Sequence, residues 1–430
     1  LNNSSHSTLN AHSYQLNAAH QRTKQTRYDN SLADYTYDPI GQLNTALGKE
    51  SGGTTNRSHE QFRYTYDAAG NLSNRVQNVL TNTFNVNSLN ELTTVARTTN
   101  FTLVGFTTIA ANSVTVNGAS ATRYADNTFA KDNLALVDGN NTFTAVATDT
   151  DGRGDTNALT LSLPATVTFV YDQNGNMITN GSRSLEYDDE NQLTRITDAG
   201  VFKSEFAYDG KLRRRVRKEY EWRNGTWVKT NEIRYVYDDN LVLQERNEFN
   251  VATKTFTRGL DLSGTRQRAG GIGGLLAFSD HTLGSTYHID FHADWNGSVT
   301  ALIDRNQQVA ARYPYDPYGN TLAASGPLAE ANLYRFSSKE LHVQSGLVYY
   351  LYRYYDLSLQ RWTNQDPLEE AGGINLHRFI SQDAVNGVDP YGEVLPHPLV
   401  PVLFIILIIG SDTSELVEEP PRPILIVEWS

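Results

Sequence analysis

The sequence predicts an all-β fold, both from its composition and from its lack of helical periodicity. The chain holds 24 Tyr and 31 Gly but only 1 Met in 430 residues. Tyr and Thr favour strands, whereas Gly and Asn favour the turns between strands. Long stretches of Ala, Leu, Glu and Lys with the helical period of about 3.6 residues are scarce. We therefore expect strands to exceed roughly 40% of the residues, where about 20–25% is usual.

A short unit recurs along the chain: an aromatic residue, any residue, Tyr-Asp, a short turn, Gly or Asn, and an apolar residue. Side chains two apart point to the same face of a strand, and Asp ends the strand by accepting hydrogen bonds from the turn. Each unit is a hairpin that cannot bury its own face, so neighbouring units must stack. The copies are Tyr37-Asp38, Tyr66-Asp67, Tyr171-Asp172, Tyr187-Asp188, Tyr208-Asp209, Tyr237-Asp238 and Tyr315-Asp316.

The repeat is interrupted from about residue 98 to residue 164. Short alternating strands, such as those at 113–118 and 158–163, are separated there by turn clusters. This spacing predicts a small inserted β-sandwich of the immunoglobulin type. The Asp-rich turns at 138–141 and 150–155 could bind calcium, but we interpret them as plain turn chemistry.

Charge and composition argue against several classes of function. The net charge of -12 disfavours nonspecific nucleic-acid binding, which needs a basic face. The chain has no Cys, which excludes disulfides, thiol catalysis and Cys-ligated zinc. The basic run Lys211–Lys218 is local, and we interpret it as a solvated strand face rather than an electrostatic patch.

Two other groups of residues suggest a ligand only weakly. His288, Asp290 and His292 alternate along a strand and could ligate a metal, but a solvated or lumen-facing strand is the favoured interpretation. Gly270–Gly274 lacks the Lys-Ser/Thr and the strand-turn-helix context of a phosphate loop. We therefore expect no cofactor and no metal.

The C-terminal part of the chain carries a series of motifs in a fixed order. They are Arg258–Gly264, Ala269–Leu276, Asp294–Val299, Tyr313–Asn320, Tyr334–Phe336, Lys339-Glu340, Gly346–Tyr350, Arg353–Asp356, Arg361-Trp362, Asp366-Pro367, Asn375-Leu376 and Asp389–Gly392. The stretch 256–393 thereby resembles the Rhs-repeat-associated core, which also occurs in toxin-complex C subunits and, more distantly, in teneurin-type YD shells. The Tyr-Asp repeats extend the resemblance over most of the chain, except the insert and the tail.

The resemblance implies a domain order. The YD repeats at 1–97 and 165–255 are expected to wind as a β-ribbon into part of a shell, interrupted by the sandwich at 98–164. The core at 256–393 is expected to plug one end of the shell. A variable C-terminal tail, 394–430, follows the core, and in many members of this family that region is a toxic effector.

The resemblance also implies a self-cleavage site, because the family's core cuts the chain just after an Asp-Pro-x-Gly motif. The matching residues here are Arg353, Asp366 and Asp389. The cut is expected near Gly392, Glu393 and Val394, with the bond after Glu393 favoured.

The chemistry of such a site is coherent. Two close carboxylates do not both ionise easily, so one can polarise a carbonyl while the other activates a water, and an Arg can orient the pair. The alternative interpretation is that both Asp residues merely cap turns before Pro367 and Pro390. Two departures from the family point to a relaxed or inactive core: Glu393 replaces an apolar residue, and Gln382-Asp383-Ala384 replaces Asn-x-Pro.

We therefore expect the scaffold of a secreted or cell-surface bacterial polymorphic toxin that encloses or displays its C-terminal segment. Its expected enzymatic activity is limited to aspartyl-type intramolecular proteolysis. Expected partners are its own C-terminal segment as cargo, an immunity protein, and a secretion or toxin-complex partner; carbohydrate or a cell surface is a further candidate, and nucleic acid is not expected. The alternatives are a non-cleaving adhesive surface protein and a degenerate fragment without an intact effector.

The ends of the chain carry two more expectations. The chain begins at Leu1 without a Met or a leader, so we expect a piece of a longer protein. The apolar run Leu399–Ile409 is shorter than the roughly 20 residues of a membrane-spanning helix. It is interpreted as a buried strand, a membrane-interacting peptide or the start of a truncated domain.

Overall fold

The computed structural model describes residues 1–393, except residue 5 and residues 283–286. Strands hold 52% and helices 3% of these described residues, so the predicted all-β class is confirmed. Among the described residues, no helix is long and apolar enough to span a membrane. The tail 394–430, with Val394 and the apolar run Leu399–Ile409, lies outside the described residues.

In the part of the chain that the structure describes, one antiparallel ribbon of 21 strands forms most of the fold. Each strand pairs with the next one in this series, and β8 pairs directly with β16 across the insert. The strands are β1 (His12–Leu16), β2 (Arg22–Arg27), β3 (Leu32–Tyr37), β4 (Leu43–Lys49), β5 (Asn56–Tyr66), β6 (Leu72–Gln77), β7 (Leu80–Val86), β8 (Leu92–Arg97), β16 (Thr166–Tyr171), β17 (Met177–Asn180), β18 (Arg183–Tyr187), β19 (Leu193–Asp198), β20 (Phe202–Tyr208), β21 (Arg214–Arg223), β22 (Thr226–Asp238), β23 (Leu241–Arg246), β24 (Ala252–Arg258), β25 (Leu275–Asp280), β26 (Tyr287–Ala293), β27 (Val299–Asp304) and β28 (Val309–Arg312).

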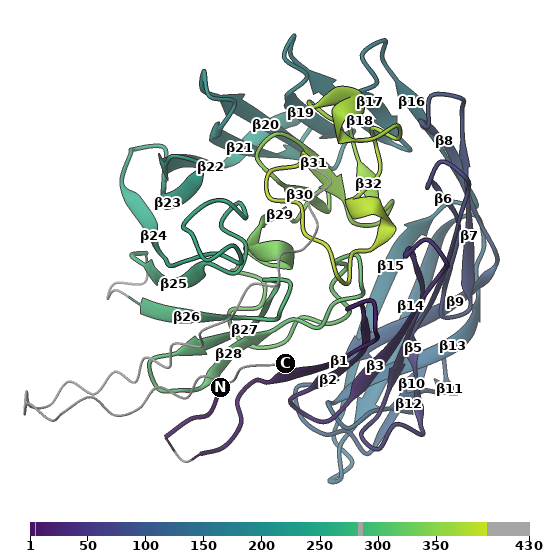
Figure 1. Ribbon diagram of the computed structural model, residues 1–430. Coiled ribbons are helices and arrows are strands. Elements are labelled where there is room, and N and C mark those ends of the chain that lie inside the picture. Colours follow the sequence, from purple (N-terminus) through teal and green to yellow (C-terminus); the bar gives the residue numbers. More distant parts are fainter. Residues whose placement is uncertain (5, 283–286, 394–430) are drawn as a thin grey trace, which may run out of the picture.

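The ribbon curls until its two ends meet. Arg312, at the end of β28, donates a hydrogen bond of 2.7 Å from Nη2 to the Leu9 carbonyl, and its guanidinium lies 3.8 Å from the centre of the Tyr28 ring. Asn10 Nδ2 donates to Thr300 Oγ1 at 2.7 Å. Figure 1 shows the ribbon running around the green and yellow segment that carries β29–β32.

The Tyr-Asp unit folds as its chemistry predicts. Asp38 Oδ1 accepts the N–H groups of Ile40 and Gln42 at 3.0 and 2.9 Å, and Gly41 takes a φ of 91°. Tyr37 donates its hydroxyl to the Arg22 carbonyl of the preceding unit at 2.6 Å, which ties neighbouring units together. The same hydroxyl-to-carbonyl bond joins Tyr66 to Leu43, Tyr208 to Leu193, Tyr237 to Arg214 and Tyr315 to Val299.

The core segment fills the space inside the ribbon. Shell side chains such as Leu43, Phe62 and Tyr64 belong to the same buried cluster as Tyr355 and Trp362 of the core. The core elements are η1 (Phe336–Ser338), β29 (Glu340–His342), β30 (Leu347–Tyr349), β31 (Tyr354–Asp356), β32 (Arg361–Trp362), η2 (Glu369–Gly372) and η3 (Ile380–Gln382).

The basic run of β21 also reaches this interior, so the prediction of a solvated strand face was wrong for part of it. Arg214 and Arg217 are buried and both pair with Glu340 of the core, Arg217 at 2.5 Å. A register shift, in which Tyr208 pairs with Arg214 but Ala207 pairs with Val216, allows both arginines to face the core although they are three residues apart. The carboxylate of Glu340 compensates the buried guanidinium groups.

The interrupting segment forms two small sheets, of four and three strands, around a common apolar cluster. They lie against β5, where Arg57 Nη2 pairs with Asp126 Oδ2 at 2.5 Å and the Ser58 N–H donates to the Tyr124 hydroxyl at 2.8 Å. The strands are β9 (Asn100–Phe106), β10 (Ser113–Val116), β11 (Ala119–Ser120), β12 (Thr122–Arg123), β13 (Thr128–Ala135), β14 (Gly139–Thr148) and β15 (Gly154–Leu163).

Candidate functional site

Every second turn of the ribbon lies at the same edge, because the strands alternate in direction. Most turns at this edge are capped by an Asp or Asn Oδ1. The capping residues are Asn17, Asp38, Asp67, Asn87, Asp172, Asp188, Asp209 and Asp294. The core stretch 361–393 crosses this turn edge and bonds to its backbone. The core donates from Arg361 to the Asn90 carbonyl, from Asn364 to the Asn191 carbonyl and from Gln382 to the Gly70 carbonyl. In the opposite direction, Asn296 of the turn edge donates to the Val385 carbonyl of the core.

Arg353 lies at the centre of the site, directly before β31, and its side chain is 0% exposed. Its Nη2 lies 2.7 Å from Asp366 Oδ2 and 3.9 Å from Asp389 Oδ2. Its Nε donates to the Gly392 carbonyl, and its guanidinium stacks 4.3 Å from the centre of the Trp362 ring. The structure therefore brings all three predicted residues together beside the predicted cleavage region.

Asp389 holds the turn that follows it. Its Oδ1 accepts the N–H groups of Tyr391, Gly392 and Glu393 at 3.1, 2.7 and 3.0 Å. Its Oδ2 is buried, has no hydrogen-bond partner among the described residues, and faces Arg353. Burial raises the pKa of Asp389, and the Arg353 charge and the three N–H donors oppose that rise only in part.

The two interpretations of the Asp residues turn out to be compatible. Asp366 Oδ1 accepts the Leu368 N–H at 2.9 Å, so this Asp caps a turn, as Asp389 also does. The second oxygen of each carboxylate faces the same Arg353 nitrogen. A turn cap and a shared Arg site are thus built from different oxygens of the same side chains.

Glu393 is the last described residue and adds a third carboxyl group. Burial raises its pKa, and the nearby Asp366 and Asp389 charges raise it further. This departure from the family therefore places a like charge beside the pair.

The backbone around Gly392 is held at every polar group from the Pro390 carbonyl to the Glu393 N–H. Lys339 Nζ donates to the Pro390 carbonyl at 2.7 Å, and the Tyr352 N–H donates to the Tyr391 carbonyl at 3.1 Å. Lys339 belongs to one of the sequence motifs, but the sequence did not predict its contact with Pro390. The only signal was its place directly before Glu340 in that motif.

The other candidates have structural partners. His288 Nε2 lies 3.5 Å from Asp290 Oδ1, whereas His292 Nδ1 faces Asn10 Nδ2 at 2.7 Å, and the described residues hold no group of three or more metal-ligand side chains. In the insert, Asp149 Oδ1 accepts two turn N–H groups. The N–H groups of Ala269 and Gly271 bond to the Asp261 carboxylate instead of facing a phosphate.

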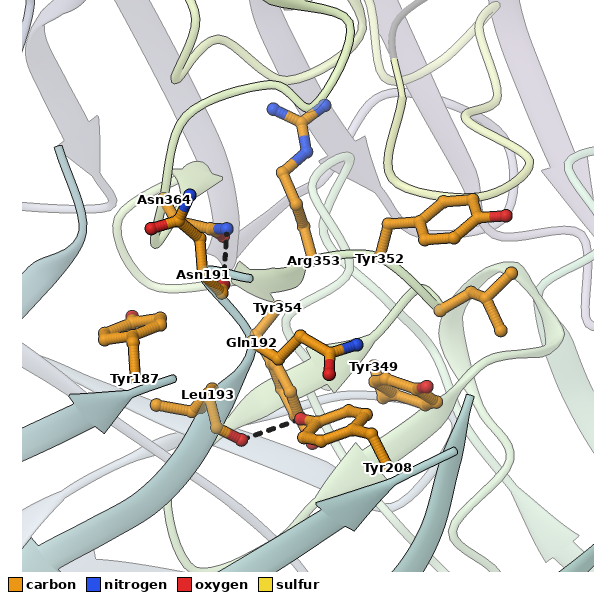
Figure 2. A pocket seen from close by; sticks show the side chains of 11 residues that line it. Tyr187, Asn191, Gln192, Leu193, Tyr208, Tyr349, Tyr352, Arg353, Tyr354 and Asn364 are labelled. Atoms are coloured by element: carbon orange, nitrogen blue, oxygen red, sulfur yellow. Dashed lines mark hydrogen bonds between the residues drawn. The ribbon is translucent and has the colours of Figure 1, made fainter. Parts of the chain in front are cut away.

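A small void lies on the other side of Arg353. It is lined mainly by tyrosines and polar side chains, and it has room for about one water molecule. Figure 2 shows the Arg353 guanidinium pointing away from Tyr187, Tyr208 and Tyr349. A void of this size is too small for a ligand, and the Tyr208 hydroxyl beside it donates to the Leu193 carbonyl.

The fold and site together define a YD-repeat ribbon closed by its own core. The family model of the teneurin YD-shell matches residues 160–371. The tRNA3(Ser)-specific nuclease WapA of Bacillus spizizenii is 29% identical over 232 residues, which are 52% of this chain and 9% of that protein. The double-stranded DNA deaminase toxin A of Burkholderia cenocepacia is 26% identical over 249 residues, 54% of this chain and 17% of that protein.

The crystal structure of TcdB2-TccC3-TEV aligns with 90% of this chain and 19% of that chain, at 19% sequence identity and a TM-score of 0.44. The chain is an Rhs-type YD-repeat protein. It spans less than a fifth of the length of these relatives.

Proposed function

We propose that this chain is the closed end of a secreted bacterial polymorphic-toxin shell, and that its core cuts the polypeptide beside Gly392 to free the segment that follows. Two matching relatives are named as a nuclease and as a deaminase toxin, which supports a toxin scaffold. The observation that carries the proposal is the convergence of Arg353, Asp366 and Asp389 on the backbone at Gly392.

The reaction divides between the two carboxylates. Asp366, paired with Arg353, serves as the ionised carboxylate that takes a proton from the attacking water. Asp389, whose pKa is raised by burial, carries a proton on Oδ2 and donates it to the leaving nitrogen. The water oxygen bonds to the carbonyl carbon, the C–N bond breaks, and a carboxyl group and a free amine result.

We place the cut after Glu393, where the resemblance to the family puts it. Asp389 and Arg353 hold the backbone as far as the Glu393 N–H, which supports a cut in the stretch that follows. A cut after Gly392 would instead make Arg353 Nε the donor to the reacting carbonyl. The masses of the two products differ by one glutamate residue, so mass spectrometry distinguishes the two bonds.

The interior of the ribbon is already filled by the core. We therefore propose that this chain seals a shell whose hollow part comes from further repeats, and that cargo lies outside the described interior. A toxin-complex or secretion partner and an immunity protein belong to this proposal.

The test is the intact mass of the purified chain under denaturing conditions. Cleavage removes residues 394–430, about 4 kDa of the 48.0 kDa total. The alternative, an adhesive surface protein, requires the chain to stay whole, and the departure at Glu393 is the observation that favours it.

A further inference from the structure

The turn 389–392 contacts Arg353 and the Asp389 side chain on one side. On its other side it packs against a wall that contains none of the three predicted site residues. This wall consists of Lys339, directly before β29, and of the loop 259–274 between β24 and β25. Lys339 Nζ donates at 2.9 Å to the Gly270 carbonyl and at 2.7 Å to the Pro390 carbonyl, so it joins the loop to the turn. Tyr391 also donates its hydroxyl to the Gln267 carbonyl of this loop.

The backbone of this wall lies very close to the backbone of the turn. Gly270 has a φ of 63°, and a Cβ at this position would overlap the Pro390 carbonyl oxygen. Only a glycine allows the loop backbone to come so near the turn without strain. The contact thus depends on both a Gly and a Lys from segments far from the motif in sequence.

We propose that Lys339 is a positioning residue for the self-cleavage reaction: by holding the Pro390 carbonyl, it fixes the backbone that Asp389 and Arg353 hold from the other side. This inference rests on the proposed function. Within residues 1–393, the hydrogen bonds of Lys339 Nζ go to the Gly270 and Pro390 carbonyls and not to the carboxylate oxygens of the pair, so Lys339 acts through the turn. An error of about 1 Å in the placement of a reacting group can cost about 100-fold in rate.

The surroundings of Lys339 predict a pH dependence. The charged groups that face it are Asp389 of the turn, Arg258 of β24 and Asp261 of the loop, and the rings of Tyr350 and Tyr391 lie 5.4 and 5.8 Å from Nζ. Burial lowers the pKa of Lys339 to about 7, and Asp389 counteracts only part of that shift. The charge-assisted hold on Pro390 is therefore present below about pH 7 and weakens above it.

The experiment compares three substitutions in the full chain. Lys339→Met removes the ammonium but keeps the aliphatic stem, and Lys339→Arg keeps a charge at every working pH. The control is Lys254→Met, because Lys254 Nζ also donates to a backbone carbonyl, that of Ala331, at 3.1 Å but away from the site. Cleavage is followed by intact mass from about pH 5 to about pH 9.

We expect Lys339→Met to slow cleavage about 100-fold and to lose the fall in rate near pH 7, whereas Lys339→Arg keeps the rate and moves the fall upward. Lys339→Met also removes a charge that faces Asp389, whereas Lys339→Arg keeps it, so the comparison of the two profiles separates the titration of Lys339 from that of Asp389. If the wild type cleaves and Lys339→Met matches Lys254→Met in rate and pH profile, the inference is overturned and the proposed function stands. An uncut wild type overturns both.

A second measurement does not depend on the reaction. In an Asp366→Asn background, which we expect to stay whole, hydrogen exchange reports how firmly the turn is held. Lys339→Met should speed exchange of the Tyr391, Gly392 and Glu393 amides about tenfold, as expected for the loss of a hydrogen bond to a charged group. Unchanged exchange would contradict a positioning role.

Discussion

The Nε of Arg353 donates a hydrogen bond to the carbonyl of Gly392, 39 residues further along the chain. Arg353 lies directly before β31 and also faces two carboxylates. The bond connects it to the last turn that the structure describes. Arg353 and Gly392 belong to different sequence motifs and come into contact only when the core folds inside the ribbon.

Glu393→Leu should speed cleavage if the wild type cuts slowly. The carboxyl group of Glu393 lies near Asp366 and Asp389, which together with burial raise its pKa, so its ionised form repels the pair. The advantage of the variant should grow as pH rises through the pKa of Glu393, because the wild type then gains the repelling charge. Time courses of intact mass at several pH values measure it, and equal rates at every pH would contradict it.

Glu340→Gln should destabilise the protein by about 3–5 kcal/mol, the usual cost of breaking a buried ion pair. It would leave the buried Arg214 and Arg217 without their shared carboxylate. Chemical unfolding measures the change. The control is Glu221→Gln, which removes the partner of Arg223 at side-chain exposures of 46% and 57% and should cost about 0–1 kcal/mol. Equal effects of the two changes would show that the buried ion pair contributes no more to the free energy of unfolding than the exposed one.

Asp294→Asn should stabilise the protein near pH 7.5 and change little near pH 4. Burial raises the pKa of Asp294 to about 6, above the unfolded value of about 3.9, so its contribution to stability is full below about pH 4 and is lost as pH rises through about 6. Asn keeps the cap, as Asn17 and Asn87 show in equivalent turns.

We expect a gain of about 1–2 kcal/mol at the higher pH from thermal or chemical unfolding. Asp38→Asn, at a turn of the same type, is the control for replacing a capping carboxylate by an amide. A stability difference that is the same at both pH values would contradict a role for the ionisation of Asp294.

Deleting residues 98–164 and joining Arg97 to Ala165 through a short Gly linker should leave the ribbon folded. The Arg97 N–H already donates to the Ala165 carbonyl at 3.0 Å, and β8 pairs with β16 without the insert. Arg57 loses Asp126 but keeps Glu50 and Glu60. Circular dichroism should retain a strand spectrum and cooperative melting, whereas loss of both would show that the insert is part of the shell.

Much of the fold could be predicted because each Tyr-Asp unit is local: the strand, the cap and the glycine lie within a few residues of one another. The same reasoning missed the turns after Asn17, Asn87 and Asn247, because the Asn Oδ1 caps them as Asp does but leaves no Tyr-Asp signature. It also missed a departure at Asp238, where a shorter turn pairs Asp238 directly with Leu241.

Contacts between distant segments could not be predicted in this way. The burial of Arg214 and Arg217 depends on where Glu340 lies inside the ribbon, and the bond from Lys339 to Pro390 depends on how the core folds back on itself. For the site, family motifs pointed to Arg353, Asp366 and Asp389, and the structure supplies their geometry. The reaction remains a prediction.

The most direct test of the central claim is the intact mass of the wild type beside Asp366→Asn, Asp389→Asn and Arg353→Ala. We expect the wild type to appear as a fragment ending at Glu393. Each Asp→Asn variant should remain wholly or largely uncut, because losing a general acid or base costs about 10²–10⁴-fold in rate. Arg353→Ala should be impaired as well, because it frees the Gly392 carbonyl and removes the charge between the carboxylates. Asp149→Asn, which alters a turn cap of the same kind in the insert, should cleave like the wild type. Full-length mass for the wild type and for Glu393→Leu would contradict the account and leave the core as a structural plug.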